Sequence, residues 1–241
     1  MGNKKTVIVT GGSQGIGAGV VTGFLEKGYN VVATSRNMTG SGEFKPNERL
    51  ALVDGDIGDI ATANAVVQAG VTKFGSIDAL VNNAGIFFAK AFTDYTSEDF
   101  RKLVSTNLDG FIYLSQLVIK QMLKQKSGGS IVTITASLAD HPIAGLTASV
   151  PMITKGGLES ISKSLALEYA KDGIRVNTVA PGIVDTPLTK AAPKDFLKTL
   201  SPMGTISDVQ DIVDAVLYLT EAKSVTGESL RVDGGAHVGK W

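Results

Sequence analysis

Residues 7–17 read Val7-Ile8-Val9-Thr10-Gly11-Gly12-Ser13-Gln14-Gly15-Ile16-Gly17, and this stretch decides the fold. Its apolar start predicts a strand, and residues 18–27 after it are typical of a helix. Glycines at positions 11, 15 and 17 allow a tight turn and a close approach to a flat, charged ligand. Because free N–H groups and the positive end of the dipole at a helix N-terminus bind anions, the segment predicts a pyrophosphate site.

The same alternation of apolar strand and helix continues along the chain. Further strands are predicted at 30–35, 50–53, 79–81, 130–135, 175–180 and 229–232, and helices at about 59–74, 97–125, 151–171 and 208–219. The glycine-rich stretch 37–47 is predicted to be a loop. Strands that are apolar on both faces and alternate with helices indicate a parallel sheet covered on both sides. We therefore expect an α/β fold with a doubly wound, Rossmann-like, seven-stranded parallel sheet, and residues 1–241 as a single domain.

Composition and charge argue against several classes of function. The 241 residues are 43% hydrophobic, which suits one large core. The 23 basic and 23 acidic residues form no block of like charge, so we expect neither a nucleic-acid partner nor a membrane-binding patch. With no cysteine and only His141 and His237, we expect no metal site. No apolar run reaches the length of a membrane span and no signal peptide precedes the first strand, so we expect a cytoplasmic protein.

The residues that end the second strand indicate which dinucleotide binds. Ligands of a doubly wound sheet lie at the carboxyl ends of its strands, where the end of the second strand faces the adenosine ribose. An acid there would bind the 2′-hydroxyl of NAD, but this chain has Ser35 and Arg36. A guanidinium pairs with a phosphate, so Arg36 favours NADP. NAD stays open, because Arg36 is also compatible with a solvated loop and position 14 holds Gln instead of a second basic residue.

Motifs along nearly the whole chain resemble those of the short-chain dehydrogenase/reductase family. They are TGGSQGIG at 10–17, Asp56-Ile57, Asn82-Asn83-Ala84-Gly85, Asn107, Ser137, Lys155, the stretch 177–182, Thr186 and a VTG…VDGG ending. The resemblance implies a three-layer α/β/α fold, a bound nicotinamide dinucleotide, a small carbonyl or alcohol as substrate and a homotetramer. It implies cofactor binding by Gly11, Ser13, Gln14, Gly15, Ile16, Gly17, Arg36, Asp56, Ile57, Asn83, Ala84, Gly85, Lys155, Pro181, Gly182, Val184 and Thr186.

The family's catalytic group is Asn, Ser, Tyr and Lys, and the resemblance implies Asn107, Ser137 and Lys155 for three of them. In the family the serine orients the reacting oxygen and the tyrosine transfers the proton. The lysine lowers the pKa of the tyrosine and holds the nicotinamide ribose, while the asparagine holds a water. The tyrosine stands four residues before the lysine, and here that position is Pro151. Since proline carries no proton to transfer, proton delivery has to be non-standard, with Ser137, a water, Lys155 and His141 as candidates.

Two functions remain open from the sequence. The first is an NADP-preferring oxidoreductase that interconverts a small carbonyl and an alcohol, favoured by the retained Asn107, Ser137 and Lys155. The second is a catalytically silent dinucleotide-binding protein, a sensor or an inactive partner, favoured by Pro151. On the substrate side, the resemblance implies a mobile lid at 183–206. The residues expected there as an apolar wall, or else as core, are Phe87, Phe88, Leu138, Ile143 and Leu146.

Overall fold

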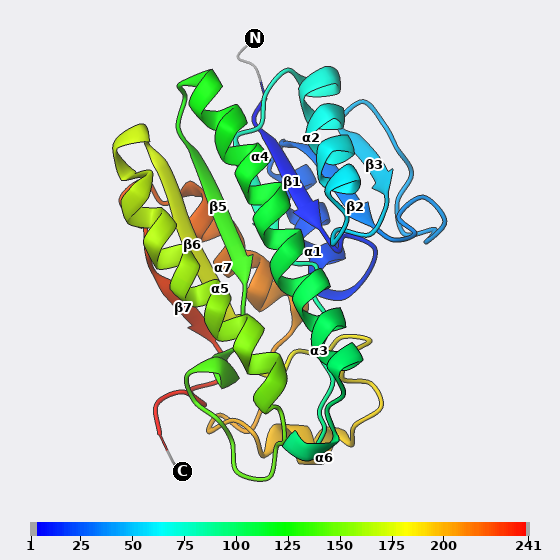
Figure 1. Ribbon diagram of the computed structural model, residues 1–241, viewed down its shortest axis with the longest axis vertical. Helices are drawn as coiled ribbons and strands as arrows, with labels where there is room; N and C mark the ends of the chain where they lie inside the picture. The colour runs from blue at the N-terminus through cyan, green and yellow to red at the C-terminus, as the bar shows by residue number, and fades with distance from the viewer. Residues whose placement is uncertain (1–3, 240–241) are drawn as a thin grey trace.

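The computed structural model describes residues 4–239 and contains one sheet of seven parallel strands (Figure 1). The strand order is β3-β2-β1-β4-β5-β6-β7, so the predicted doubly wound sheet is confirmed. The strands are β1 (Thr6–Thr10), β2 (Asn30–Ser35), β3 (Leu50–Asp54), β4 (Ala79–Asn82), β5 (Gly129–Ile134), β6 (Ile174–Pro181) and β7 (Ser229–Val232). The helices are α1 (Gly15–Glu26), α2 (Ile60–Phe74), α3 (Ser97–Val104), α4 (Gly110–Gln125), α5 (Ser149–Glu168), α6 (Lys194–Lys198) and α7 (Val209–Glu221).

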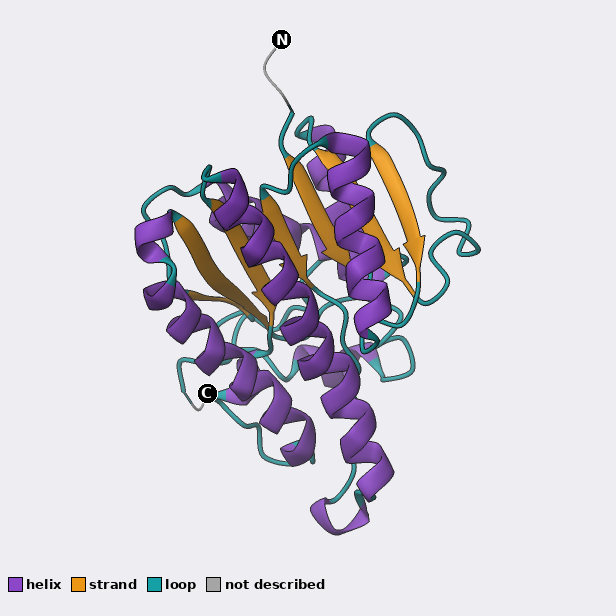
Figure 2. Ribbon diagram, turned by 45° about the horizontal axis from the view of Figure 1, so that its top comes forward, coloured by secondary structure: helices purple, strands orange, loops and turns teal. Residues whose placement is uncertain are grey.

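Helices bury both faces of the sheet, which forms the middle layer in Figure 2. Neighbouring residues of a strand point to opposite faces. On one face Val7 and Val9 of β1 pack with α1 and α7, and on the other Ile8 packs with residues of α2, α4 and α5. All five residues of β1 are buried, which is why the strand shows no polar alternation in its sequence.

Several helix ends follow the local signals in the sequence. The Asp59 side chain caps α2, accepting a hydrogen bond from Ala61 N at 2.9 Å, and Gly75 ends the helix with a φ of 83°. Helix α5 begins two residues before Pro151 and ends at Glu168, three residues earlier than predicted. Pro151 is the third residue of this helix, where a backbone N–H has no partner within the helix, so proline costs no helical hydrogen bond.

The helix predicted over 97–125 is interrupted, which corrects the sequence interpretation. A π-helical turn, Ser105–Asp109, separates α3 from α4 and holds Asn107 in a buried position. The backbone stays helical through this turn, so the amphipathic pattern carries no sign of the interruption. Such turns are frequent at functional sites. The short helix α6 and the start of α1 at Gly15, within the glycine turn, were not predicted either.

None of the helices within residues 4–239 combines the length and the hydropathy needed to cross a membrane.

Candidate functional site

A cavity of about 1000 Å³ lies at the carboxyl edge of the sheet, where the strand arrowheads end in Figure 1. It is lined by residues at or just after the ends of β1, β2, β3, β4, β5 and β6. Strand β1 pairs with β2 on one side and with β4 on the other, so the winding of the chain reverses there. In doubly wound sheets this reversal is the place where dinucleotides bind.

The glycine turn after β1 forms one wall of the cavity and excludes side chains. Gly11 and Gly15 have φ angles of 66° and 54°, a region in which residues with a Cβ are strained. A Cβ at Gly17 would lie 2.1 Å from the Gly11 carbonyl oxygen. The N-cap Gln14 makes no side-chain capping bond, and the first turn of α1 contains no acidic residue. The exposed start of α1 therefore suits an anion.

Hydrogen bonds fasten this turn to the loop after β4. The Thr10 Oγ1 atom accepts hydrogen bonds from Asn83 N at 3.0 Å and Ala84 N at 2.9 Å. In return, Asn83 Nδ2 donates to Thr10 O at 2.9 Å and to Gly11 O at 3.3 Å. The two walls of the cavity, far apart in sequence, are thus held at a set separation.

All the residues that the family resemblance implied for cofactor binding line this one cavity. They come from the glycine turn, from the ends of β2 and β3, from the loop after β4, from α5 and from the segment after β6. Arg36 is exposed and, within residues 4–239, forms no ion pair. Its charge is therefore available to a ligand.

Lys155 reaches the cavity from α5. Its Nζ atom donates a hydrogen bond to Ile134 O at 2.8 Å. Burial lowers the pKa of the Lys155 ammonium to about 8, because the apolar surroundings disfavour the charged form. The ionisable side chains that line the cavity, among the described residues, are Arg36, Asp56 and Lys155.

The other implied catalytic positions do not line the large cavity within the described chain. Asn107 is occupied by structural hydrogen bonds: its Oδ1 accepts from Ile86 N at 2.9 Å, and its Nδ2 donates to Ile86 O at 3.1 Å and to Thr154 Oγ1 at 2.9 Å. The Thr154 hydroxyl in turn donates to Pro151 O at 2.8 Å. Ser137 is buried at the start of a 3₁₀ turn, Ser137–Ala139.

His141 lies behind this turn, away from the cavity lining. Its backbone N–H donates to Ser137 O at 3.1 Å, and its ring packs edge-on to His237 with 5.8 Å between ring centroids. The Nδ1 atom of His237 lies 2.9 Å from an oxygen of the buried Asp233. The two histidines of the chain are therefore neighbours, a pairing that the sequence did not predict.

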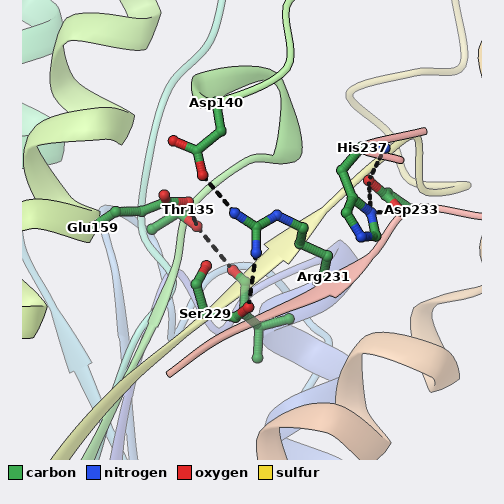
Figure 3. Close-up of polar contacts among 8 residues, drawn as sticks. Thr135, Asp140, Glu159, Ser229, Arg231, Asp233 and His237 are labelled. Atoms are coloured by element: carbon green, nitrogen blue, oxygen red, sulfur yellow. Dashed lines mark hydrogen bonds and ion pairs between the residues drawn. The ribbon is translucent and has the colours of Figure 1, made fainter. Parts of the chain in front are cut away.

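A polar cluster joins the same turn to α5 and β7, and sequence reasoning missed it (Figure 3); Thr135 and Glu159 in it are buried, whereas Asp140 is exposed. Asp140 pairs with Arg231 Nη2 at 2.6 Å, and Thr135 Oγ1 donates to Glu159 Oε1 at 2.9 Å. Burial raises the pKa of the Glu159 carboxyl, and the negative charge and hydrogen bonding of Asp140 raise it further. Position 159 falls on the buried face of α5, eight residues after Pro151, so helical periodicity was the signal available.

The substrate half of the cavity is mostly apolar. Of the residues expected as a wall, Phe87, Leu138 and Leu146 line the cavity, while Phe88 and Ile143 do not. The segment expected to form a lid contributes Pro187, Leu188, Thr189, Ala192, Phe196, Leu197 and Leu200 to the lining. Two of its lysines pair with carboxylates: Lys194 with Asp185 at 2.7 Å, and Lys198 with Asp195 at 3.8 Å.

Comparison with known proteins gives consistent matches over almost the full chain. The family model described as Enoyl-(Acyl carrier protein) reductase matches residues 11–237. The chain is 36% identical over 245 residues to the 3alpha-hydroxysteroid dehydrogenase of Mediterraneibacter gnavus, covering 97% of each chain. It is 37% identical over 246 residues to the NADP-dependent (R)-specific alcohol dehydrogenase of Lentilactobacillus kefiri, covering 96% of each.

Comparison with solved structures gives matches to proteins of the same fold. The 3-ketoacyl-(acyl-carrier-protein) reductase of Brucella melitensis complexed with NADH has a TM-score of 0.90 at 29% identity, covering 97% of this chain and 98% of that one. ElxO with NADP bound has a TM-score of 0.90 at 30% identity, covering 98% and 100%. Together with the motifs and the switch-point cavity, these matches show that the chain belongs to the short-chain dehydrogenase/reductase family of oxidoreductases.

Proposed function

We propose that the protein is an oxidoreductase that uses NADP in preference to NAD and interconverts a small carbonyl compound and an alcohol. The observation that carries the proposal is the single cavity that joins a glycine turn and Arg36 at one end to Lys155 and an apolar pocket at the other. A bound nicotinamide supplies or accepts a hydride. The relatives named as dehydrogenases and reductases support this reaction class.

The residues present fit such a cofactor. The turn from Ser13 to Gly17 would hold the phosphates, because the start of α1 has no side-chain cap and no acidic residue. Gly17 keeps this turn compact, since a Cβ there would collide with Gly11 O and Asn83 Nδ2. Asp56 and Ile57 would frame the adenine, and Lys155 with the segment Pro181–Thr186 would border the nicotinamide. We assign the 2′-phosphate of NADP to Arg36, because its guanidinium is exposed at the ribose end of the cavity.

Proton transfer in this protein cannot follow the route of its family, because Pro151 occupies the tyrosine position. The backbone carbonyl of Pro151 accepts a hydrogen bond from Thr154, but its ring has no donor. A positioned general acid contributes roughly 10²- to 10⁴-fold to such a reaction. We propose that another group of the chain supplies this contribution.

Turnover of a carbonyl panel by the wild type and by Pro151→Tyr tests the function. We expect the wild type to bind NADPH and to reduce at least one activated carbonyl, and Lys155→Ala to abolish the reaction. If NADPH binds but turnover requires the restored tyrosine, the natural protein is instead a silent dinucleotide-binding protein. Pro151 is the observation that favours this second candidate.

We also propose a single-domain subunit, a homotetramer and a cytoplasmic location, as the family resemblance and the sequence lead us to expect. Light scattering coupled to size-exclusion chromatography tests the assembly. Limited proteolysis tests the single domain, and fractionation of cells tests the compartment.

A further inference from the structure

We propose that Lys155 is the proton donor and acceptor of the reaction, acting on the substrate oxygen directly and not through a tyrosine. This inference rests on the proposed oxidoreductase function and identifies the group that replaces the missing phenol. It differs from the role that the family resemblance implies for the lysine, which is to hold the ribose and to lower the pKa of a tyrosine.

Among the ionisable side chains that line the cavity in the described residues, Lys155 is the one suited to exchange a proton with the substrate. Of the three ionisable side chains that line the cavity, Arg36 and Asp56 follow β2 and β3, on one side of β1. Lys155 contacts the end of β5, on the opposite side of β1. A guanidinium group, moreover, is unsuited to exchanging a proton with a substrate. His141 does not line the cavity within the described residues.

Hydroxyl groups near Lys155 are poor alternatives. The Thr135 hydroxyl lies within hydrogen-bond distance of both Glu159 Oε1, at 2.9 Å, and Val179 O, at 3.2 Å, so its proton already has two competing acceptors. Ser137 is buried outside the cavity lining. A hydroxyl also has no ionised form near neutral pH from which to act as a base.

The surroundings of the Lys155 ammonium leave donors free for a ligand. The group has three N–H donors, and the Ile134 carbonyl takes one at 2.8 Å. A Cβ added to Gly85 would lie 3.4 Å from Nζ, so the ammonium stands against the bare backbone of the loop after β4. Two N–H bonds therefore remain for the substrate and the ribose.

No counter-ion holds the proton on Lys155. Among the described residues it forms no salt bridge, and the next ionisable side chain along the inner face of α5, Glu159, binds Thr135 instead. Asn107, from the π-helical turn, is uncharged. Burial accordingly lowers the lysine pKa to about 8, so ammonium and amine are both populated near neutrality. A group poised in this way serves as an acid for reduction and as a base for oxidation.

The step balances without any further reactant. In reduction the carbonyl carbon gains a hydride, and with it two electrons, from the reduced nicotinamide that the proposed function would supply, and the electron pair of the C=O π bond moves to oxygen. That oxygen takes a proton from Lys155 Nζ and becomes a hydroxyl group. The neutral amine then regains a proton from water, and oxidation follows the same steps in reverse.

The absence of cysteine from the chain allows a specific chemical test. Lys155→Cys, alkylated with 2-bromoethylamine, places an amine of nearly lysine length at this one position, with a lower pKa because of the neighbouring sulfur. Lys155→Arg keeps the charge and the donors but cannot titrate near neutral pH. Lys163, exposed on the same helix, supplies the matched controls Lys163→Arg and alkylated Lys163→Cys.

We expect Lys155→Arg to lower kcat roughly 10²- to 10⁴-fold while NADPH binding, measured by fluorescence titration, changes far less. Alkylated Lys155→Cys should recover much of the activity, with its pH–rate profile moved to lower pH. The Lys163 variants should behave like the wild type. As a readout independent of turnover, acetylation of the ligand-free protein at a series of pH values, followed by mass spectrometry, should give Lys155 a midpoint near pH 8.

Three results would distinguish the proposed role of Lys155 from the proposed oxidoreductase function. If the wild type reduces a carbonyl and Lys155→Arg keeps its kcat and pH profile, the role of Lys155 is refuted while the oxidoreductase function stands. If the alkylated cysteine restores activity with an unshifted profile, the amine is not the titrating group and the inference is again refuted. If the wild type binds NADPH but reduces no carbonyl, the proposed function itself is refuted.

Discussion

Replacing Thr10 by valine removes two of the four hydrogen bonds that hold the two walls of the cavity together. The Thr10 hydroxyl is the acceptor for the backbone N–H groups of Asn83 and Ala84, at 3.0 and 2.9 Å. The residue is 2% exposed, and valine has nearly the same shape. The substitution therefore leaves the packing intact and deprives two N–H groups of their partner.

We expect Thr10→Val to lower the free energy of unfolding by about 2–4 kcal/mol. Leaving one buried donor without an acceptor costs about 1–3 kcal/mol, and two donors are affected. Asn83 and Ala84 are only partly buried, which keeps the sum below the upper limit. For a chain of this length each kcal/mol moves the Tm by about 2–4 °C, so the Tm should fall by roughly 5–15 °C.

Thr34→Val is the matched control. Thr34 is the register partner of Thr10 on the neighbouring strand and is 1% exposed, but its Oγ1 has no hydrogen-bond partner within the described structure. Removing that hydroxyl should leave the Tm unchanged or raise it. Differential scanning calorimetry without cofactor measures both variants. Equal shifts for the two, or no loss of stability in Thr10→Val, would refute the reasoning.

Three further predictions follow from single residues. Arg36→Ala should weaken NADP binding roughly ten- to hundred-fold and leave NAD binding nearly unchanged, as isothermal titration calorimetry would show; equal losses for both would exclude a phosphate contact. Gly17→Ala should abolish NADPH binding, because its Cβ would lie 2.1 Å from Gly11 O, whereas Gly156→Ala, with open space around its Cβ, should stabilise α5 by about 0.5–1 kcal/mol. Burial raises the pKa of Glu159 above its usual 4.5, so the contribution of this carboxyl to stability is complete below pH 4.5 and is lost as the pH rises through the folded-state pKa. In urea titrations the free energy of unfolding of Glu159→Gln should therefore rise relative to that of the wild type as the pH increases above 4.5, and a difference that does not change with pH would contradict the assignment.

The parts of the site that could be predicted from sequence are those that depend on local backbone geometry or on where apolar strands end. The glycine turn is visible because few residue types tolerate its φ angles and its closeness to Gly11 O. The Asn83-Ala84-Gly85 run and Arg36 follow strands whose apolar runs are plain, so their place at the carboxyl edge could be inferred before their contacts were known. Lys155 was likewise identified, together with the proline four residues earlier.

Contacts between side chains distant in sequence were not predictable in this way. The hydrogen bonds of Asn107 with Ile86 and Thr154 depend on a π-helical turn that leaves no mark on the amphipathic pattern. The neighbouring rings of His141 and His237 meet only after the sheet has brought the end of β7 beside the turn that follows β5. Such contacts depend on how strands and helices pack, and a local sequence pattern does not predict them.

The sequence by itself therefore determined the class of fold, the dinucleotide turn and the loss of the tyrosine, since each is a property of local backbone geometry or of a single residue type. Tertiary structure alone decided which ionisable groups share a cavity. It engaged Asn107 in hydrogen bonds to Ile86 and Thr154 and left Ser137 and His141 outside the lining. It also placed the partly buried Lys155 ammonium against that cavity, with no counter-ion among the described residues. The glycine turn thus points to where a dinucleotide would bind, and the packing of α5 against the end of β5 determines which group stands ready to move the proton.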